Sequence, residues 1–187
     1  MGQIIHFEER AVARLRERLG AIEEANEDLI AFAQGHSGAV ASIHLAAILV
    51  VESRSLEDLL RTVTRDWPGI LGIDSAALAL VLGQRAFHAT AKEIAPADPA
   101  WVKRILAGRA RVEVRAVDRG HVLFGAADAG RIRAEALVRV DCAGSRPVGL
   151  LALGQGTPLE IGSAHGSELL LFLGRIVAST AQRFAAG

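Results

Sequence analysis

The stretch that most constrains the fold of this chain is residues 134–184, where two β-rich runs are followed by a long apolar helix. The runs 136–141 and 148–153 flank the segment Ala-Gly-Ser-Arg-Pro, whose composition is typical of a hairpin connection. The helix carries apolar side chains around much of its circumference, so we expect it to be buried against the sheet and against a second helix, of this chain or of a partner. This block predicts the end of an α+β domain, an α/β sandwich in which helices flank an antiparallel sheet.

The preceding segments predict the other strands of that sheet. The run 73–83 is the first clear strand, with Leu78, Leu80 and Leu82 on one face and alanines on the other, and we expect it at the centre of the sheet. In the run 111–117 charged residues alternate with valines. This pattern is typical of an edge strand, because the charges disfavour pairing with a strand of another chain.

Three further segments complete the predicted domain. Residues 55–58 resemble a capping box and begin a helix that we expect to run to Asp66, where Trp-Pro-Gly at 67–69 ends it. A short helix is expected at 100–107. The loop that follows the edge strand has an apolar centre around Leu123 and Phe124.

A heptad pattern precedes the domain and predicts a coiled-coil-like helix. A buried Asn in such a seam fixes the register and favours two strands, which points to a homodimer. The alternative is an amphipathic helix packed on its own domain, and Ile30 and Phe32 widen the apolar face in its favour. The seam positions are Val12, Leu15, Leu19, Ile22, Asn26, Leu29 and Ala33.

Two glycines in residues 34–38 predict a hinge after this helix. Helical apolar spacing resumes in 39–52, close enough in phase to continue the seam after a kink. We therefore predict a dimerisation helix of the signalling type over residues 1–35 and a folded domain over 36–187.

Composition excludes several classes of function. Lys plus Arg and Asp plus Glu both number 21, and a net charge of zero makes nucleic acid a poor candidate partner. No signal peptide and no apolar run long enough to span a membrane are present, and the single Cys142 fits a reducing compartment. We expect a cytoplasmic protein that has no membrane or nucleic-acid partner.

No residue pattern predicts catalysis, a metal site or a cofactor. The six histidines are scattered without ligand spacing, and His121, in the loop with the apolar centre, is the one that we single out. Cys142 lacks a resolving thiol, so we interpret it as inert. Arg139 shares the strand face of Leu137: it either points into a pocket towards an anionic partner or, as we prefer, lies on a solvent-facing side.

Basic residues around the short helix form one further group to weigh. Interleaved carboxylates and the lack of an aromatic series favour a solvated helix and edge strand over a phosphate-binding surface. The basic residues are Lys103, Arg104, Arg109, Arg111 and Arg115.

The order of these motifs resembles a bacterial family of GAF-like domains called domain of unknown function 484. The matching pieces are "NEDLIAFAQ" at 26–34, "SLEDLL" at 55–60, "HVLFG" at 121–125, "AEALVRV" at 134–140 and "VGLLALG" at 148–154. The resemblance implies a GAF-like fold, a cytoplasmic location, dimers and no established activity or ligand. The chain departs from the family's usual Gly-Thr before the last helix, because Gly166 and Ser167 stand there, and Ile161 replaces a loop aromatic.

These observations favour a non-enzymatic GAF-like sensor module that binds a small molecule or a protein partner and homodimerises through its terminal helices. The first alternative is a ligand-free structural adaptor, whose pocket is filled by its own side chains, and an enzyme is the last. The pocket residues that we predict are Leu80, Leu82, Trp101, Ile105, Leu123, Phe124 and Arg139.

Overall fold

The computed structural model describes residues 38–142, 145–158 and 165–185. The chain divides into two compact units, Met1–Val40 and Ala41–Gly187, and the structure described below is that of the second. The predicted dimer helix, with Val12, Leu15, Leu19, Ile22, Asn26 and Leu29, lies outside the described residues, as do residues 34–37 of the hinge predicted at 34–38, whose last residue, Gly38, is helical. The predicted division at residue 35 stays a prediction.

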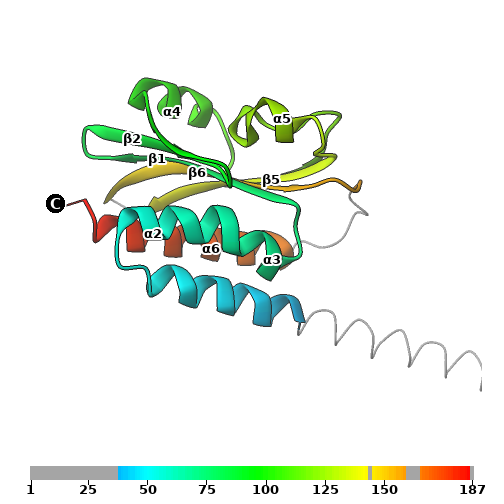
Figure 1. Cartoon of the computed structure of the whole chain (residues 1–187), viewed down its shortest axis with the longest axis horizontal. Helices are drawn as coiled ribbons and strands as arrows, with labels where there is room; N and C mark the ends of the chain where they lie inside the picture. The colour runs from blue at the N-terminus through cyan, green and yellow to red at the C-terminus, as the bar shows by residue number, and fades with distance from the viewer. Residues whose placement is uncertain (1–37, 143–144, 159–164, 186–187) are drawn as a thin grey trace, which may run out of the picture. The chain divides into compact units, whose positions relative to one another are not determined.

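A six-stranded sheet, formed among the described residues, lies at the centre of the second unit (Figure 1). The strand order is β3-β2-β1-β6-β5-β4, and every neighbouring pair is antiparallel. The strands are β1 (Ser75–Leu82), β2 (Arg85–Ala89), β3 (Ile94–Ala97), β4 (Val112–Ala116), β5 (Ala134–Cys142) and β6 (Ser145–Gln155).

The sheet confirms the main strand predictions. The closing runs pair as the antiparallel neighbours β5 and β6, β1 is central between β2 and β6, and β4 is an edge strand. The sequence does not predict β2 and β3, which are only five and four residues long. Pro96 lies within β3, where it is tolerated because β3 is the other edge of the sheet.

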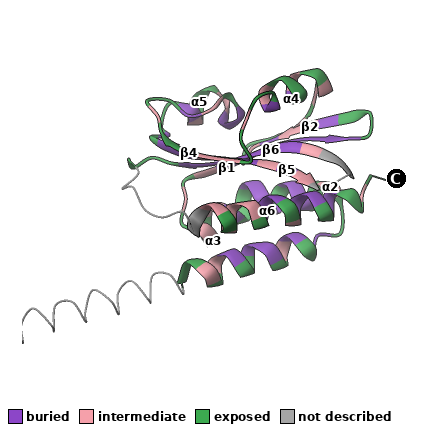
Figure 2. Cartoon of the chain, turned by 180° about the vertical axis from the view of Figure 1, so that it is seen from behind, coloured by how far each residue is buried: buried purple, intermediate pink, exposed green. Residues whose placement is uncertain are grey.

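Helices cover both faces of the sheet, as Figures 1 and 2 show. On one face lie the helical residues 41–51, α2 (Leu56–Arg61), the π-helical turn η1 (Thr62–Asp66), α3 (Trp67–Leu71) and α6 (His165–Gln182). On the other face lie α4 (Pro99–Leu106), the 3-10 turn η2 (Val122–Phe124) and α5 (Gly125–Ala129). Each face has its own buried core, so the sheet is apolar on both sides.

The helix that begins at Ser55 does not end at Asp66, as the sequence had led us to expect. The Ser55 hydroxyl accepts the amide of Asp58, but the chain then continues through η1 into α3 and ends at Gly72, which has a φ of 65°. In η1 the turn widens, so that the Trp67 amide bonds to the Thr62 carbonyl, and Pro68 enters the first turn of α3, where its missing amide costs little. Trp67 is fully buried and its indole donates to the Ala46 carbonyl at 3.0 Å.

Helix α6 is buried on two sides, as predicted, and its second neighbour is within the chain. It packs on β5 and β6 and also contacts α2. At its end the Arg183 guanidinium donates to the carbonyls of Val51 and Ser53, at 2.9 and 3.5 Å. These contacts join the last helix to the end of the helical residues 38–51.

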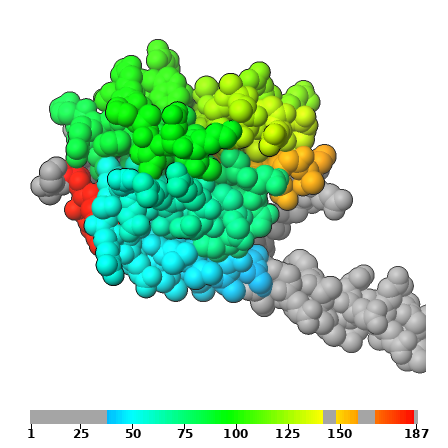
Figure 3. Space-filling model, viewed as in Figure 1, coloured from blue at the N-terminus to red at the C-terminus, as the bar shows by residue number. Residues whose placement is uncertain are grey.

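The helical residues 41–51 present two apolar stripes. Ile43, Ala47 and Val50, in the phase of the predicted seam, are buried in the core of this chain's own domain. A second stripe, which we call the outer stripe, comprises Leu45, Ile48 and Val51, whose exposures are 48%, 53% and 48%. Within residues 41–51 the predicted seam is therefore used inside the domain, while the outer stripe faces solvent. In Figure 3 the surfaces of this helix and of α2 are continuous on the viewed face.

Candidate functional site

The predicted pocket residues divide between the two faces of the sheet. Trp101 and Ile105 of α4 pack with Leu123 and Phe124 of η2 on one face. Leu80 and Leu82 lie on the opposite face, in the core beneath α2 and α6. This corrects the predicted grouping, because side chains alternate along β1 and it is Ala79 and Val81 that face α4 and η2.

The space under η2 is filled by the protein's own side chains. Leu123 and Phe124 are buried, and Phe124 lies so close to β6 that a β-carbon on Gly154 would be 2.8 Å from its ring. His88 Nε2 lies 2.7 Å from the Leu123 carbonyl, and the His88 ring meets Trp101 edge-on at 5.5 Å. Among the described residues, the apolar pocket predicted here is therefore occupied from within.

Arg139 lies on the same face as α4, with Leu137 beside it. Leu137 is buried, so our preferred reading of this strand face as solvent-facing was wrong. The Arg139 Nε lies 3.1 Å from Asp141, and its Nη1 lies 3.5 Å from the Leu106 carbonyl at the end of α4. Arg139 thus satisfies the carboxyl end of a helix, where a cation is favourable.

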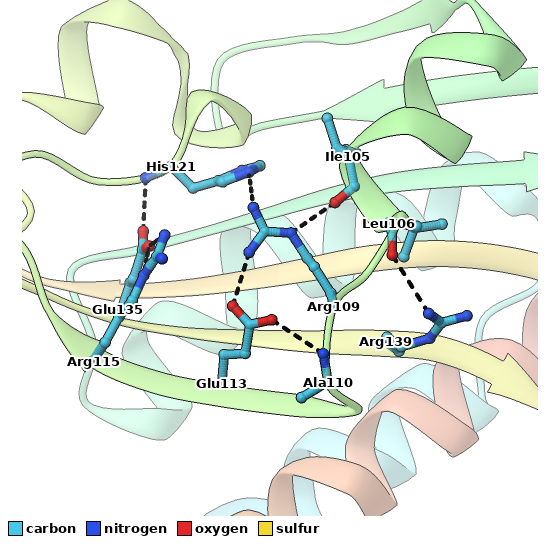
Figure 4. Close-up of polar contacts among 9 residues, drawn as sticks. All are labelled: Ile105, Leu106, Arg109, Ala110, Glu113, Arg115, His121, Glu135 and Arg139. Atoms are coloured by element: carbon cyan, nitrogen blue, oxygen red, sulfur yellow. Dashed lines mark hydrogen bonds and ion pairs between the residues drawn. The ribbon is translucent and has the colours of Figure 1, made fainter.

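Five polar side chains form a connected group beside α4, which we call the polar cluster: Arg109, Glu113, Arg115, His121 and Glu135 (Figure 4). Glu135 points inward from β5 and its side chain is wholly buried. One of its oxygens accepts Arg115 Nε and Nη2 at 2.8 and 2.6 Å, and the other accepts the His121 amide at 2.6 Å. The buried charge is thereby paired and hydrogen-bonded.

Arg109 connects the end of α4 to β4 and to the loop before η2. Its guanidinium donates to the Ile105 carbonyl at 2.7 Å and to Glu113 at 2.8 Å, and it lies 3.1 Å from His121 Nε2. The predicted solvated basic surface therefore holds for the exposed Lys103, Arg104, Arg111 and Arg115, although Arg115 also pairs with Glu135. It does not hold for Arg109, which is half-buried and tied to Glu113.

Both ring nitrogens of His121 face donors. The Leu123 amide approaches Nδ1 at 3.3 Å and Arg109 approaches Nε2. A neutral imidazole has one acceptor nitrogen, so only one of these contacts is a full hydrogen bond at a time. Burial, and then the Arg109 charge, lower the pKa of His121. A neutral His121 fits this site better than a protonated one, and its position is that of a cap on η2 rather than of an acid or base facing open space.

A cavity of about 530 Å³, which we call the α5 cleft, lies beside α5 where five chain segments meet. Its volume is within the range of small-molecule sites. The cleft could not be predicted from the sequence, because the lining residues lie in α5, in turns and at strand ends, and they share no spacing or motif. The lining residues are Asp74, Ser75, Ala91, Lys92, Asp128, Arg131, Ile132 and Gly156.

Among the described residues, no three side chains of His, Cys, Asp or Glu gather as a metal site requires, and no helix has the length and apolar character to cross a membrane. The backbone of Cys142 ends β5, and its side chain lies outside the described residues.

Solved structures of GAF domains share this fold. The GAF domain of A. aeolicus nlh2 matches with a TM-score of 0.56 at 12% identity, over 79% of this chain and 98% of that one. The GAF domain of a sensor histidine kinase from Pseudomonas syringae pv. tomato matches with a TM-score of 0.52 at 11% identity, over 81% and 90%. A far-red-absorbing protein solved with bound biliverdin IXa matches with a TM-score of 0.51 at 14% identity, over 76% and 98%.

The structural likeness establishes the fold, and a sequence comparison establishes the family. None of the curated proteins matches the chain. A family model matches residues 1–186. The chain therefore belongs to the family described as "Protein of unknown function, DUF484", and its domain has the GAF-like fold that the sequence motifs predict.

Proposed function

We propose that this chain is a non-enzymatic sensor module of the cytoplasm, which binds a small molecule or a protein partner and homodimerises through its terminal helices. The observation that carries the proposal is the α5 cleft, a ligand-sized cavity lined by charged groups of both signs. That a protein of the same fold is solved with bound biliverdin lends support, because it is an instance of this architecture binding a small molecule.

Binding is favoured over catalysis by the surroundings of the titratable groups. His121 has both ring nitrogens next to donors, and Glu135 is saturated by Arg115 and by a backbone amide. A general base needs an open approach to a substrate proton, which neither group offers. The polar cluster instead stabilises η2 and β4.

The dimer proposal rests on the outer stripe together with the heptad pattern of residues 12–33. Leu45, Ile48 and Val51 project three apolar side chains into solvent from one side of a helix. Exposed apolar side chains that cluster in this way mark interaction surfaces. A second copy of this chain would cover the stripe.

Native mass spectrometry of the freshly purified full chain, followed by thermal-shift screening, tests the binding function. We expect a retained small molecule in the native spectrum, or a metabolite that raises the melting temperature in a saturable way. A ligand-free spectrum with no shift from any metabolite or cyclic nucleotide would reject the small-molecule function.

One observation favours a second function, that of a ligand-free structural adaptor. The apolar space between the sheet and η2 is filled by Leu123 and Phe124, so this space offers no room to an apolar ligand. Under this function the same experiment returns a ligand-free dimer whose melting temperature no metabolite changes.

A further inference from the structure

The α5 cleft has an apolar floor and charged walls. Ile132, which is buried, forms the floor, and a β-carbon on Gly154 would lie 2.7 Å from its Cδ1, so the floor is held against β6. Asp74 and Ser75 at the start of β1 and Lys92 in the β2–β3 turn line the walls. The cleft can therefore hold a short aliphatic group and polar groups at the same time.

The cleft holds four charged residues, Asp74, Lys92, Asp128 and Arg131, and two of them neutralise each other. Lys92 Nζ lies 3.0 Å from Asp128 Oδ1, so this ion pair leaves little net charge for a ligand. The charge of Asp74 is not neutralised in this way, because its Oδ2 accepts only the neutral amide of Gly156, at 2.6 Å. Within the part of the chain that the structure describes, no cationic side chain pairs with Asp74 and no hydrogen bond or ion pair engages the Arg131 guanidinium. One carboxylate and one guanidinium remain for a ligand.

Gly156 keeps the space between these two residues open. A β-carbon placed on Gly156 would lie 3.3 Å from Asp74 Oδ2 and 3.4 Å from the Arg131 carbonyl oxygen. The Asp74 carboxylate and the backbone carbonyl of Arg131 therefore flank Gly156 at short range, and a side chain at position 156 would occupy the gap. Asp74 and Arg131 both line this cavity, so a ligand in the cleft lies beside both residues.

We propose that the α5 cleft binds a compact zwitterion of the α-amino-acid class, whose ammonium group pairs with Asp74 and whose carboxylate pairs with Arg131. This inference rests on the proposed function, since it names the chemical class of that function's small molecule. A ligand that carries only a cation or only an anion would leave one of the two charges unpaired, whereas a zwitterion satisfies both. The floor at Ile132 takes a short aliphatic side chain of the ligand.

Isothermal titration calorimetry of the full chain tests this, with neutral aliphatic amino acids as probes. Each amino acid is compared with its amide, which lacks the carboxylate, and with the matching carboxylic acid, which lacks the amine. We expect at least one amino acid to bind about tenfold more tightly than either analogue. Arg131→Gln should reduce the amino-acid affinity to that of the amide, and Asp74→Asn should reduce it to that of the acid.

Matched control variants distinguish the loss of a charge inside the cleft from the loss of the same charge elsewhere on the surface. Arg119→Gln and Asp118→Asn remove the same charges from exposed positions outside the cleft and should leave the affinity unchanged. Asp74→Asn keeps a side-chain oxygen that can accept the Gly156 amide, and Arg131→Lys keeps the cation, so both preserve local structure, which circular dichroism verifies.

The inference would be overturned if no amino acid binds at concentrations up to about 10 mM. It would also be overturned if an analogue with one charge binds as tightly as the amino acid, or if Arg131→Gln and Asp74→Asn both keep wild-type affinity. If native mass spectrometry meanwhile shows a different retained molecule, the proposed function stands and only the ligand class falls. If neither experiment detects a small molecule, the ligand class and the small-molecule function both fall.

Discussion

Among the described residues, Glu135 is the charged side chain that is buried, and its surroundings explain why it is stable there. Its carboxylate accepts two hydrogen bonds from Arg115 and one from the His121 amide, and these three bonds compensate for its lost hydration. Because Arg115 belongs to β4 and His121 precedes η2, this one carboxylate connects an edge strand and a loop to β5. The polar cluster thus determines where η2, and with it Leu123 and Phe124, is placed.

His121 should make the stability of the domain depend on pH. Since its folded pKa is lowered, the unfolded chain binds the proton more readily, so stability is complete above the ordinary pKa of about 6.5 and is lost as the pH falls towards the folded value. His121→Asn keeps an acceptor for the Leu123 amide but does not titrate. We expect urea unfolding between about pH 5 and 7 to show a weaker fall in the free energy of unfolding for this variant.

His44→Asn, which changes an exposed histidine on the helical residues 38–51, serves as the control and should retain the wild-type pH dependence. If the free energy of unfolding depends on pH equally in His121→Asn and in the wild type, His121 is not the cause of the pH dependence.

At the scale of elements, close backbone approaches determine how α6 sits on the sheet. A β-carbon on Gly174 would lie 2.7 Å from the Arg139 carbonyl oxygen and 2.9 Å from Val138 Cγ1. The glycine therefore lets α6 approach β5 more closely than any other residue would allow. Leu173 and Val177 reach the core beside it because of this short distance.

Gly174→Ala should destabilise the domain although alanine is the better helix former. The added methyl group meets backbone that cannot move aside cheaply, and overpacking of this kind costs roughly 1–3 kcal/mol, more than the gain of about 1 kcal/mol in helix propensity. Ser179→Ala, on the exposed side of the same helix, should change the free energy of unfolding by less than about 0.5 kcal/mol. Chemical denaturation measures both, and an unchanged or higher midpoint for Gly174→Ala would contradict the argument.

Part of this architecture could be predicted from sequence, and the rest required the fold. The alternation of Leu78, Leu80 and Leu82 predicts a central strand, because the period of two is a local property. The same alternation does not say which helices cover which face, and so Leu80 was grouped with Trp101, on the wrong side of the sheet.

The polar cluster and the α5 cleft were less accessible to sequence analysis for a similar reason. Glu135 and Arg115 are 20 residues apart, and the Asp74 carboxylate meets the Gly156 amide across 82 residues. No local spacing in the sequence predicts such contacts, because it is the sheet topology that brings these residues together. The short strands β2 and β3, with His88 and Pro96 in them, carry too few alternating residues to be recognised.

At the scale of the whole molecule, the helical residues 41–51 use one face for the domain and leave the outer stripe exposed. A homodimer formed there would place two copies of this helix side by side, as the heptad of residues 12–33 also predicts. The domain itself would remain intact without the partner, because Ile43 and Val50 already belong to its core.

Ile48→Glu in the full chain tests this arrangement. We expect the wild type to show the mass of a dimer by light scattering and the variant to shift towards the monomer, because a charge in an apolar interface is costly to bury. Val122→Glu alters a comparably exposed apolar residue on η2, over the opposite face of the sheet, and should remain a dimer. A wild-type monomer, or a dimer that Ile48→Glu leaves unchanged, would reject the outer stripe as the interface.

The bond from Arg183 to the carbonyl of Val51 has a consequence for how the protein is made. The two residues are 132 positions apart, so the helical residues 41–51 leave the ribosome long before their last partner exists. Until α6 emerges, the core that Val50 shares with Leu173 and Val177 is open to solvent. Nascent chains in this state expose apolar surface and are aggregation-prone. Synthesis of α6 should therefore be the step at which the nascent domain can bury this apolar surface.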